Sequence, residues 1–321
     1  MKILLTGAGG PAAISVWKSL GASHELHMAD MDPRAPGLYL VPAPQRLVLP
    51  RGEAPGFADE ALAACRSRGI QALVSTVDAE LVPLALRRAD FEVAGIQLPL
   101  SPLDTLRLCR DKLALLAHLH GVVPVPVHAV LTEAPFELSA PLPWFAKPRG
   151  GSGSRDLTLL ETRAALATLP RDGSLLVQEY LPGEEYSVDV YVRRDGEVVA
   201  AVPRERMKTD SGIAITARTV RVPEVVDAAV RAARGAGIRH VANVQFRRGA
   251  DGVFKLLEIN PRFPGTLPLT TAAGVDMPAL LVAELEGRSL PDGLLPFEEL
   301  MSVRYLTEKF VDPQEWRALC Q

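Results

Sequence analysis

The sequence contains few cysteines, no long apolar run and no excess of positive charge. Its three cysteines, Cys65, Cys109 and Cys320, are widely separated and odd in number, which argues against a disulfide framework or a zinc site. No apolar run approaches the roughly 20 residues that a helix needs to cross a bilayer. The chain starts with MKILLTG, a strand-like segment without the charged and apolar regions of a signal peptide. These absences predict a cytoplasmic protein with free thiols.

The charge of the chain is nearly balanced, with 35 Lys and Arg against 38 Asp and Glu and a net charge of −3. No general positive field therefore attracts nucleic acid or a membrane. The six histidines show no metal-ligand spacing. We expect small molecules as partners, and an anionic ligand would need a local cluster of basic side chains.

The length of 321 residues predicts two or three domains. In the first 100 residues, short apolar segments alternate with helical patterns, as in Lys2–Thr6 followed by Pro11–Leu20. This alternation is typical of a parallel sheet covered by helices, an α/β fold. One helix is expected from Leu103 to His120. After it, strands, short helices and a hairpin signal at Asp195-Gly196 indicate an α+β arrangement.

A lysine followed by a glycine-rich loop occupies Phe145–Arg155. Glycines let backbone N–H groups approach phosphate oxygens closely, and Lys147 adds a positive charge. The lysine precedes the glycines, so this segment is not a Walker A motif. A Gly/Ser hairpin tip with a solvated lysine explains the segment equally well when it is taken alone.

A second segment, Leu176–Asp189, joins two predicted strands through a Pro-Gly turn. Backbone groups at the turn could contact an adenine edge, and the carboxylate of Glu184 or Glu185 could bind ribose hydroxyls. From the spacing alone, a solvated acidic turn is the simpler interpretation.

A predicted late hairpin places Gln245 on one strand and Glu258 and Asn260 on the next. The last two are two residues apart and so point to the same face of their strand. Carboxylate and amide oxygens are hard ligands suited to Mg²⁺. A carboxylate in this apolar setting needs a positive partner, which Arg262 or a metal ion would supply. We therefore predict a metal site here and not merely a polar edge strand.

Taken together, these segments resemble the ATP-grasp superfamily, and in particular the branch of the carbamoyl phosphate synthetase large subunit and its stand-alone relatives. The resemblance covers about residues 101 to 285 in the family's order. The pieces that carry it are Lys147-Pro148 with the Gly-Ser-Gly loop, Gln178-Glu179-Tyr180, Asn243–Phe246 and Glu258–Arg262.

This resemblance implies three domains. Residues 1–100 are expected to form a Rossmann-like pre-ATP-grasp domain, residues 101–180 the N-terminal ATP-grasp subdomain, and residues 181–321 the C-terminal subdomain with the metal site. The fold class expected is therefore α/β and α+β. A homodimer is a further expectation, because dimers are common in the family.

The resemblance also implies residues for nucleotide binding. Basic side chains would contact the phosphates, the loop would cover them, the linker would read adenine and one acid would bind ribose. The basic side chains are Lys112 and Lys147, and the loop residues are Ser152 and Gly153. The linker residues are Glu179, Tyr180 and Leu181, and the ribose-binding acid is Glu185, with Glu184 as the alternative.

For the chemical step, the resemblance makes Gln245, Glu258 and Asn260 the metal-site residues. Arg262 would contact the transferring phosphate, with Lys147 and Arg218 as further catalytic residues. An acidic substrate would be bound by Arg204, Arg206, Arg262 and the first glycine turn at Gly9.

Two departures from the family pattern are visible. Gln245 replaces the acid that many ATP-grasp enzymes use as first metal ligand, which lowers the negative charge of the site. Arg155-Asp156 follows the glycine-rich loop, which makes the closure of this loop over ATP less certain. The sequence also shows neither an amidotransferase nor a second synthetase half, so carbamoyl phosphate is not the expected product.

The expected activity is an ATP- and Mg²⁺-dependent ligase, with Mn²⁺ as an alternative ion. It would join a small carboxylic acid, such as an amino acid, to an amine or a thiol through an acyl phosphate, releasing ADP and phosphate. The main alternative is an NAD(P)-dependent dehydrogenase, because Gly7–Ala12 fits G-x-G-x-x-A, with Asp30 and Asp32 near the expected ribose-binding position. A non-catalytic nucleotide-binding protein is the third hypothesis.

Overall fold

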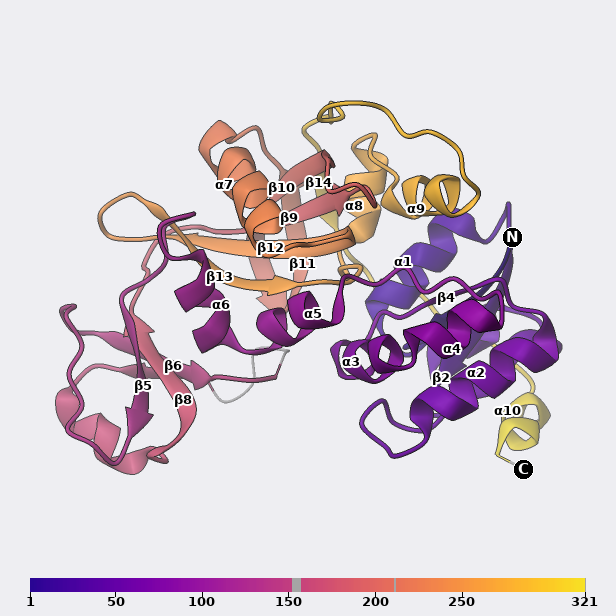
Figure 1. Cartoon of the computed structure of the whole chain (residues 1–321), viewed down its shortest axis with the longest axis horizontal. Helices are drawn as coiled ribbons and strands as arrows, with labels where there is room; N and C mark the ends of the chain where they lie inside the picture. The colour runs from indigo at the N-terminus through magenta and orange to yellow at the C-terminus, as the bar shows by residue number, and fades with distance from the viewer. Residues whose placement is uncertain (152–156, 211, 321) are drawn as a thin grey trace.

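The computed structural model describes residues 1–151, 157–210 and 212–320, and they form three sheets. Figure 1 shows the N-terminal sheet and a small, magenta to pink sheet at opposite ends of the molecule, with a large orange sheet between them. The α/β unit followed by two antiparallel sheets confirms the predicted fold class. The predicted domain limits near residues 100 and 180 fall between these sheets.

The N-terminal sheet is parallel, with strand order β3-β2-β1-β4. One face packs against α2, α3 and α4, and the other against α1, because both faces of these short strands are apolar. The elements are β1 (Lys2–Thr6), α1 (Pro11–Leu20), β2 (Glu25–Asp30), η1 (Pro36–Leu40), η2 (Ala43–Gln45), β3 (Arg46–Val48), α2 (Phe57–Arg68), β4 (Ala72–Val74), α3 (Asp78–Leu86) and α4 (Arg88–Val93).

The helix expected from Leu103 to His120 is two helices, α5 (Leu103–Arg110) and α6 (Lys112–Leu119). Asp111 separates them with an extended backbone (φ −108°, ψ 102°), and its carboxylate accepts the N–H groups of the first turn of α6. An aspartate in this conformation is a good N-cap, which explains why the helix ends and restarts here. The prediction of one continuous helix was wrong at this residue.

The small sheet is antiparallel, with order β5-β8-β6-β7. Its inner face forms a separate core around the buried ring of Trp144. The elements are β5 (His128–Thr132), β6 (Trp144–Pro148), β7 (Thr158–Leu160), η3 (Arg163–Thr168) and β8 (Asp172–Glu179).

The large sheet has the order β13-β12-β9-β10-β11-β14, and all its pairs are antiparallel. Its apolar face packs against α7, whereas α8 and α9 on the other side share a core with α1 of the N-terminal unit. The elements are β9 (Glu185–Val192), β10 (Val198–Asp210), β11 (Ile213–Thr219), α7 (Pro223–Gly235), β12 (His240–Arg248), β13 (Phe254–Asn260), α8 (Leu267–Ala272), α9 (Met277–Leu285) and β14 (Met301–Val303). The last helix, α10 (Pro313–Leu319), returns to the N-terminal unit, where Glu315 pairs with Arg46 of β3 (Figure 1).

None of the helices in the described part of the chain is both long and apolar enough to cross a membrane.

The helix break at Asp111 gives a test of local stability. We expect Asp111→Ala to lower the free energy of unfolding by about 1–2 kcal/mol, because the first turn of α6 loses its cap. Asp111→Asn keeps a capping oxygen and should cost less. Chemical denaturation of the three proteins measures the difference, and an alanine variant as stable as the wild type would contradict the capping role.

Candidate active site

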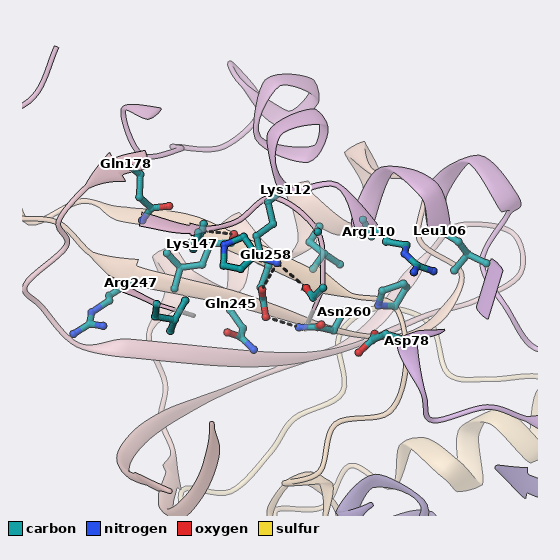
Figure 2. A pocket seen from close by; sticks show the side chains of 18 of the residues that line it. Asp78, Leu106, Arg110, Lys112, Lys147, Gln178, Gln245, Arg247, Glu258 and Asn260 are labelled. Carbon is teal, nitrogen blue, oxygen red and sulfur yellow. Dashed lines mark hydrogen bonds and ion pairs between the residues drawn. The ribbon is translucent and has the colours of Figure 1, made fainter. Parts of the chain in front are cut away.

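A cavity of about 520 Å³ lies between the N-terminal unit, the small sheet and the large sheet. Its walls come from α3, α5 and α6, from β6 and the end of β8, and from β12 and β13. Figure 2 shows Gln178 at one end of this cavity, Lys112, Lys147 and Glu258 in the middle, and Asp78 at the other end. Segments that are far apart in the sequence therefore share one site.

Two lysines from different elements enter the middle of the cavity. Lys112 is the first residue of α6, and its Nζ donates to the carbonyl of Gly151 at 2.8 Å. Lys147 lies on β6 and donates to the carbonyl of Leu257 at 3.3 Å. Burial lowers the pKa of Lys147 to about 8; nearby Lys112 adds to this shift, and the Glu258 carboxylate opposes it. An anion bound here would restore the charged form of Lys147 and so be stabilised by it.

The predicted metal-site residues lie together on β12 and β13. Gln245 pairs with Glu258 across the two strands, and Asn243 pairs with Asn260. The Asn260 amide group donates to Glu258 Oε1 at 3.0 Å, and the Gln245 amide group donates to Asn243 Oδ1 at 3.3 Å. Within the described part of the chain, Gln245 Oε1 and Asn260 Oδ1 accept no hydrogen bond, so both oxygens can bind a ligand.

These donors fit a hard cation in part. Carboxylate and amide oxygens suit Mg²⁺. Among the described residues, however, no group of three or more His, Cys, Asp or Glu side chains is arranged to hold a metal ion. Glu258 also lies 3.7 Å from Lys112 Nζ, so part of its charge is already balanced. A magnesium ion here would need the amide oxygens and oxygens of a bound ligand in addition to Glu258.

The end of the cavity near β8 carries an unpartnered polar atom. Gln178 is 3% exposed, and its Oε1 has no hydrogen-bond partner. A buried acceptor without a partner is costly, so a ligand donor is the simplest way to satisfy it. Gln178 was predicted only as part of the motif Gln178-Glu179-Tyr180 and not as a residue of the site. The available signal was an amide side chain at the end of the apolar strand Leu175–Val177.

Next to Gln178, Tyr180 and Leu181 line the cavity, whereas the side chain of Glu179 does not. The Glu179 carboxylate accepts the backbone N–H of Val127 at 2.7 Å and the ammonium of Lys255 at 2.9 Å. The backbone N–H of Glu179 also donates to the carbonyl of Val127, at 2.9 Å. These bonds hold the linker in place, and Glu179 itself does not line the cavity.

The two acids predicted as alternatives for ribose binding lie in different places. Glu185 lines the cavity and pairs with Arg206, whereas Glu184 lies outside the lining and pairs with Arg248 at 3.0 Å. Of these two acids, Glu185 is the one that lines the cavity.

The predicted arginines are dispersed. Arg262 pairs with Asp78 at 2.8 Å, and Asp78 lines the end of the cavity nearest α3. Arg204 is 1% exposed and makes two hydrogen bonds to the buried carboxylate of Asp189. Its predicted contact with substrate is therefore contradicted, because the guanidinium is enclosed in the protein.

Arg262 itself and the two remaining arginines, Arg206 and Arg218, lie outside the cavity lining. Arg206 holds Glu185 and the carbonyl of Gly212, and Arg218 pairs with Glu205 at 2.7 Å on the surface. Two unpredicted basic residues, Arg110 and Arg247, line the cavity instead.

Part of the predicted loop lies outside the described residues, namely Ser152 and Gly153. The preceding glycines, Gly150 and Gly151, line the cavity, and the latter supplies the carbonyl that accepts the Lys112 ammonium.

The first glycine turn lies outside the cavity lining and is internally bonded. The N–H of Gly9 donates to Asp30 Oδ2 at 2.7 Å, the N–H of Ala8 to the carbonyl of Ala29, and the N–H of Gly10 to the carbonyl of Gly7. Segment η1 packs directly on this turn through the Gly37 N–H, which donates to the Ala8 carbonyl. These three amides and the ribose-position acid Asp30 are thus already engaged, which argues against the dinucleotide alternative and against substrate binding at Gly9.

Two family models match the chain. The model described as "ATP-grasp in the biosynthetic pathway with Ter operon" matches residues 171–309, and "PylC-like, N-terminal domain" matches residues 3–99.

Relatives of known function show the same likeness. The arginine-specific carbamoyl phosphate synthase large chain of Geobacillus stearothermophilus is 28% identical over 197 residues, which cover 53% of this chain and 19% of that one. The chain thus spans about a fifth of that relative. The D-alanine–D-alanine ligase of Thermotoga maritima is 29% identical over 237 residues, covering 67% of this chain and 72% of that protein.

Two solved structures are similar in fold. N5-carboxyaminoimidazole synthetase from Staphylococcus aureus has a TM-score of 0.72 at 15% sequence identity, and the matched region covers 94% of this chain and 81% of the synthetase chain. The L-amino acid ligase from Bacillus licheniformis has a TM-score of 0.68 at 15% sequence identity, and the matched region covers 89% of this chain and 74% of the ligase chain. At this identity the likeness concerns the fold.

The pKa of Lys147 predicts how binding of a triphosphate depends on pH. Below about pH 8 the ammonium is charged and attracts phosphate; as the pH rises through about 8, the proton is lost and the affinity should fall. Lys147→Arg keeps its charge over this range, so its affinity should change less. Titration calorimetry with a non-hydrolysable ATP analogue measures both profiles, and identical slopes would refute the assignment.

Proposed function

Because the chain is an ATP-grasp ligase that resembles the carbamoyl phosphate synthetase branch, we propose that it activates a small carboxylic acid with ATP and joins it to an amine. The acid, such as an amino acid, would receive the γ-phosphoryl group to give an acyl phosphate. The amine would then displace phosphate, giving an amide, ADP and phosphate. The observation that carries this proposal is that Lys112 and Lys147 face the oxygen ligands of Glu258 and Asn260 across one cavity.

The nucleotide would lie along the cavity with adenine at Gln178. Adenine presents an N–H donor at N6 and an acceptor at N1. The unpartnered Gln178 Oε1 can accept the first. Among the described residues, the N–H of Leu181 donates to no protein acceptor and can donate to the second. Ribose would then lie near Glu185, and the phosphates near the two lysines.

Magnesium would be held by Glu258, Asn260 and Gln245 together with phosphate oxygens, and it would supply charge neutralisation at the β- and γ-phosphates. Manganese suits the same oxygen ligands. Because Gln245 is neutral, the protein itself contributes one carboxylate to this group.

The chain's own contribution to phosphoryl transfer is positioning and electrostatic stabilisation. Lys112 and Lys147 would stabilise negative charge on the phosphates. Arg262 would contact the acid substrate or its acyl phosphate, and Asp78 holds it at the cavity end that adjoins the N-terminal unit. The substrate would therefore lie between α3, α5 and the end of β13.

The adenine assignment predicts nucleotide preference. Guanine carries an acceptor where adenine has its N6 donor, so the acceptor of Gln178 should favour ATP over GTP. We expect Gln178→Leu to weaken ATP binding about tenfold and to narrow this preference, because one buried hydrogen bond is lost. Gln178→Glu retains a side-chain oxygen that can accept the adenine N–H, so this variant should still prefer ATP over GTP. Competition binding measures both, and a leucine variant that discriminates as the wild type does would exclude this contact.

The ligase activity can be tested by phosphate release from ATP with pools of amino acids, other carboxylic acids and amines. A productive pool should release phosphate only when both substrates are present, and mass spectrometry should find a product with the mass of the condensed pair. Glu258→Gln should reduce turnover at least a hundredfold, since the one carboxylate of the proposed metal site becomes neutral. Full substrate-dependent turnover by this variant would overturn the assignment.

A further inference from the structure

A buried carboxylate behind the proposed metal site accepts four hydrogen bonds. Asp189, on β9, is 0% exposed. Arg204 donates to both of its oxygens, at 2.9 and 2.6 Å; Asn243 donates to Oδ1 at 2.8 Å, and Thr270 donates to Oδ2 at 2.5 Å. A carboxylate has about four acceptor sites, and here donors fill all of them. Asp189 therefore acts only as an acceptor.

This acceptor fixes the orientation of the amide beside it. An asparagine amide has one donor end and one acceptor end. The –NH₂ end of Asn243 must face Asp189, so its Oδ1 faces the other way, toward Gln245. Gln245 must then present its own –NH₂ group to Asn243, which directs its Oε1 away from Asn243.

The orientation matters because Gln245 is an amide. A carboxylate offers an oxygen whichever way it turns, whereas an amide turned by 180° offers –NH₂, which cannot bind a cation. Because residue 245 is a glutamine, the contacts around its side chain must determine which end of the amide faces the proposed metal site.

We propose that Asp189 and Asn243 form a positioning relay that holds the Gln245 oxygen toward the metal. Arg204, which was predicted to bind the substrate, completes the relay by neutralising Asp189. The inference rests on the proposed function, because it concerns how well the same site holds Mg²⁺.

The orientation of Asn260, the other amide of the proposed metal site, is also set by a carboxylate. Glu258 Oε1 accepts the amide group of Asn260 and so turns Asn260 Oδ1 outward. Both amides of the proposed site thus owe their orientation to a carboxylate, one within the cavity and one buried behind it.

The test measures how much a metal ion improves nucleotide binding. The dissociation constant of a non-hydrolysable ATP analogue is determined by calorimetry with EDTA and with excess Mg²⁺, and the ratio of the two is the metal gain. Asn243→Ala should reduce the metal gain about tenfold, since residues that hydrogen-bond to a metal ligand typically change metal affinity by this factor or more. Its binding in EDTA should stay as in the wild type.

Tyr191→Phe is the matched control. Tyr191 lies two residues from Asp189 on the same face of β9, and its hydroxyl donates to Glu284 at 3.0 Å, outside the relay. This variant loses one buried hydrogen bond but should keep the full metal gain. Asn243→Ser is the second relay variant if the alanine variant does not fold, and it should lose the gain in the same way.

A double-mutant cycle separates positioning from a general structural effect. In a Gln245→Glu background either oxygen can bind the metal, so adding Asn243→Ala should no longer reduce the metal gain. An unchanged gain in Asn243→Ala alone, or an equal loss in both backgrounds, would overturn the relay. If the wild type itself shows no metal gain, the proposed magnesium site fails, and that outcome is distinct from failure of the relay.

Discussion

The site depends on an imbalance of buried charge. Lys112 and Lys147 are both more than 90% buried, and the carboxylate closest to them in the cavity is Glu258. Two ammonium groups and one carboxylate leave a surplus positive charge in a place where water screens poorly. Burial, more than the neighbouring Lys112, lowers the pKa of Lys147, which shows the cost of keeping this ammonium charged without a bound anion. An anionic ligand removes that cost, so the cavity favours a polyphosphate without any positive field over the whole protein.

The local structure around the lysines serves this arrangement. Asp111 ends α5 and caps α6, which makes Lys112 the first residue of a helix, with its side chain directed into the cavity. Arg149, just after β6, pairs with the same carboxylate through two hydrogen bonds and thereby fixes β6 next to α6. The two lysines therefore keep their separation because one aspartate joins the elements that carry them.

Features that depend on nearby residues in the sequence, such as strands and helices, could be predicted. Features that depend on contacts between distant segments could not. Strand Lys2–Thr6 and helix Pro11–Leu20 were predicted with their exact bounds, because apolar periodicity and a first-turn proline are local signals. The break at Asp111 was missed, since apolar residues continue across it. The enclosure of Arg204 was missed too, because its partner lies on a neighbouring strand and no spacing along the chain reveals that pairing.

The N-terminal unit is joined to the site by packing and by charge. Helix α1 shares its core with α8 and α9, so the two units bury apolar surface together. Asp78, at the start of α3, pairs with Arg262 just after the last strand of the proposed metal site. Asp78 offsets the charge of Arg262 and holds its guanidinium beside the N-terminal unit. The guanidinium is therefore oriented for a group that arrives between the two units.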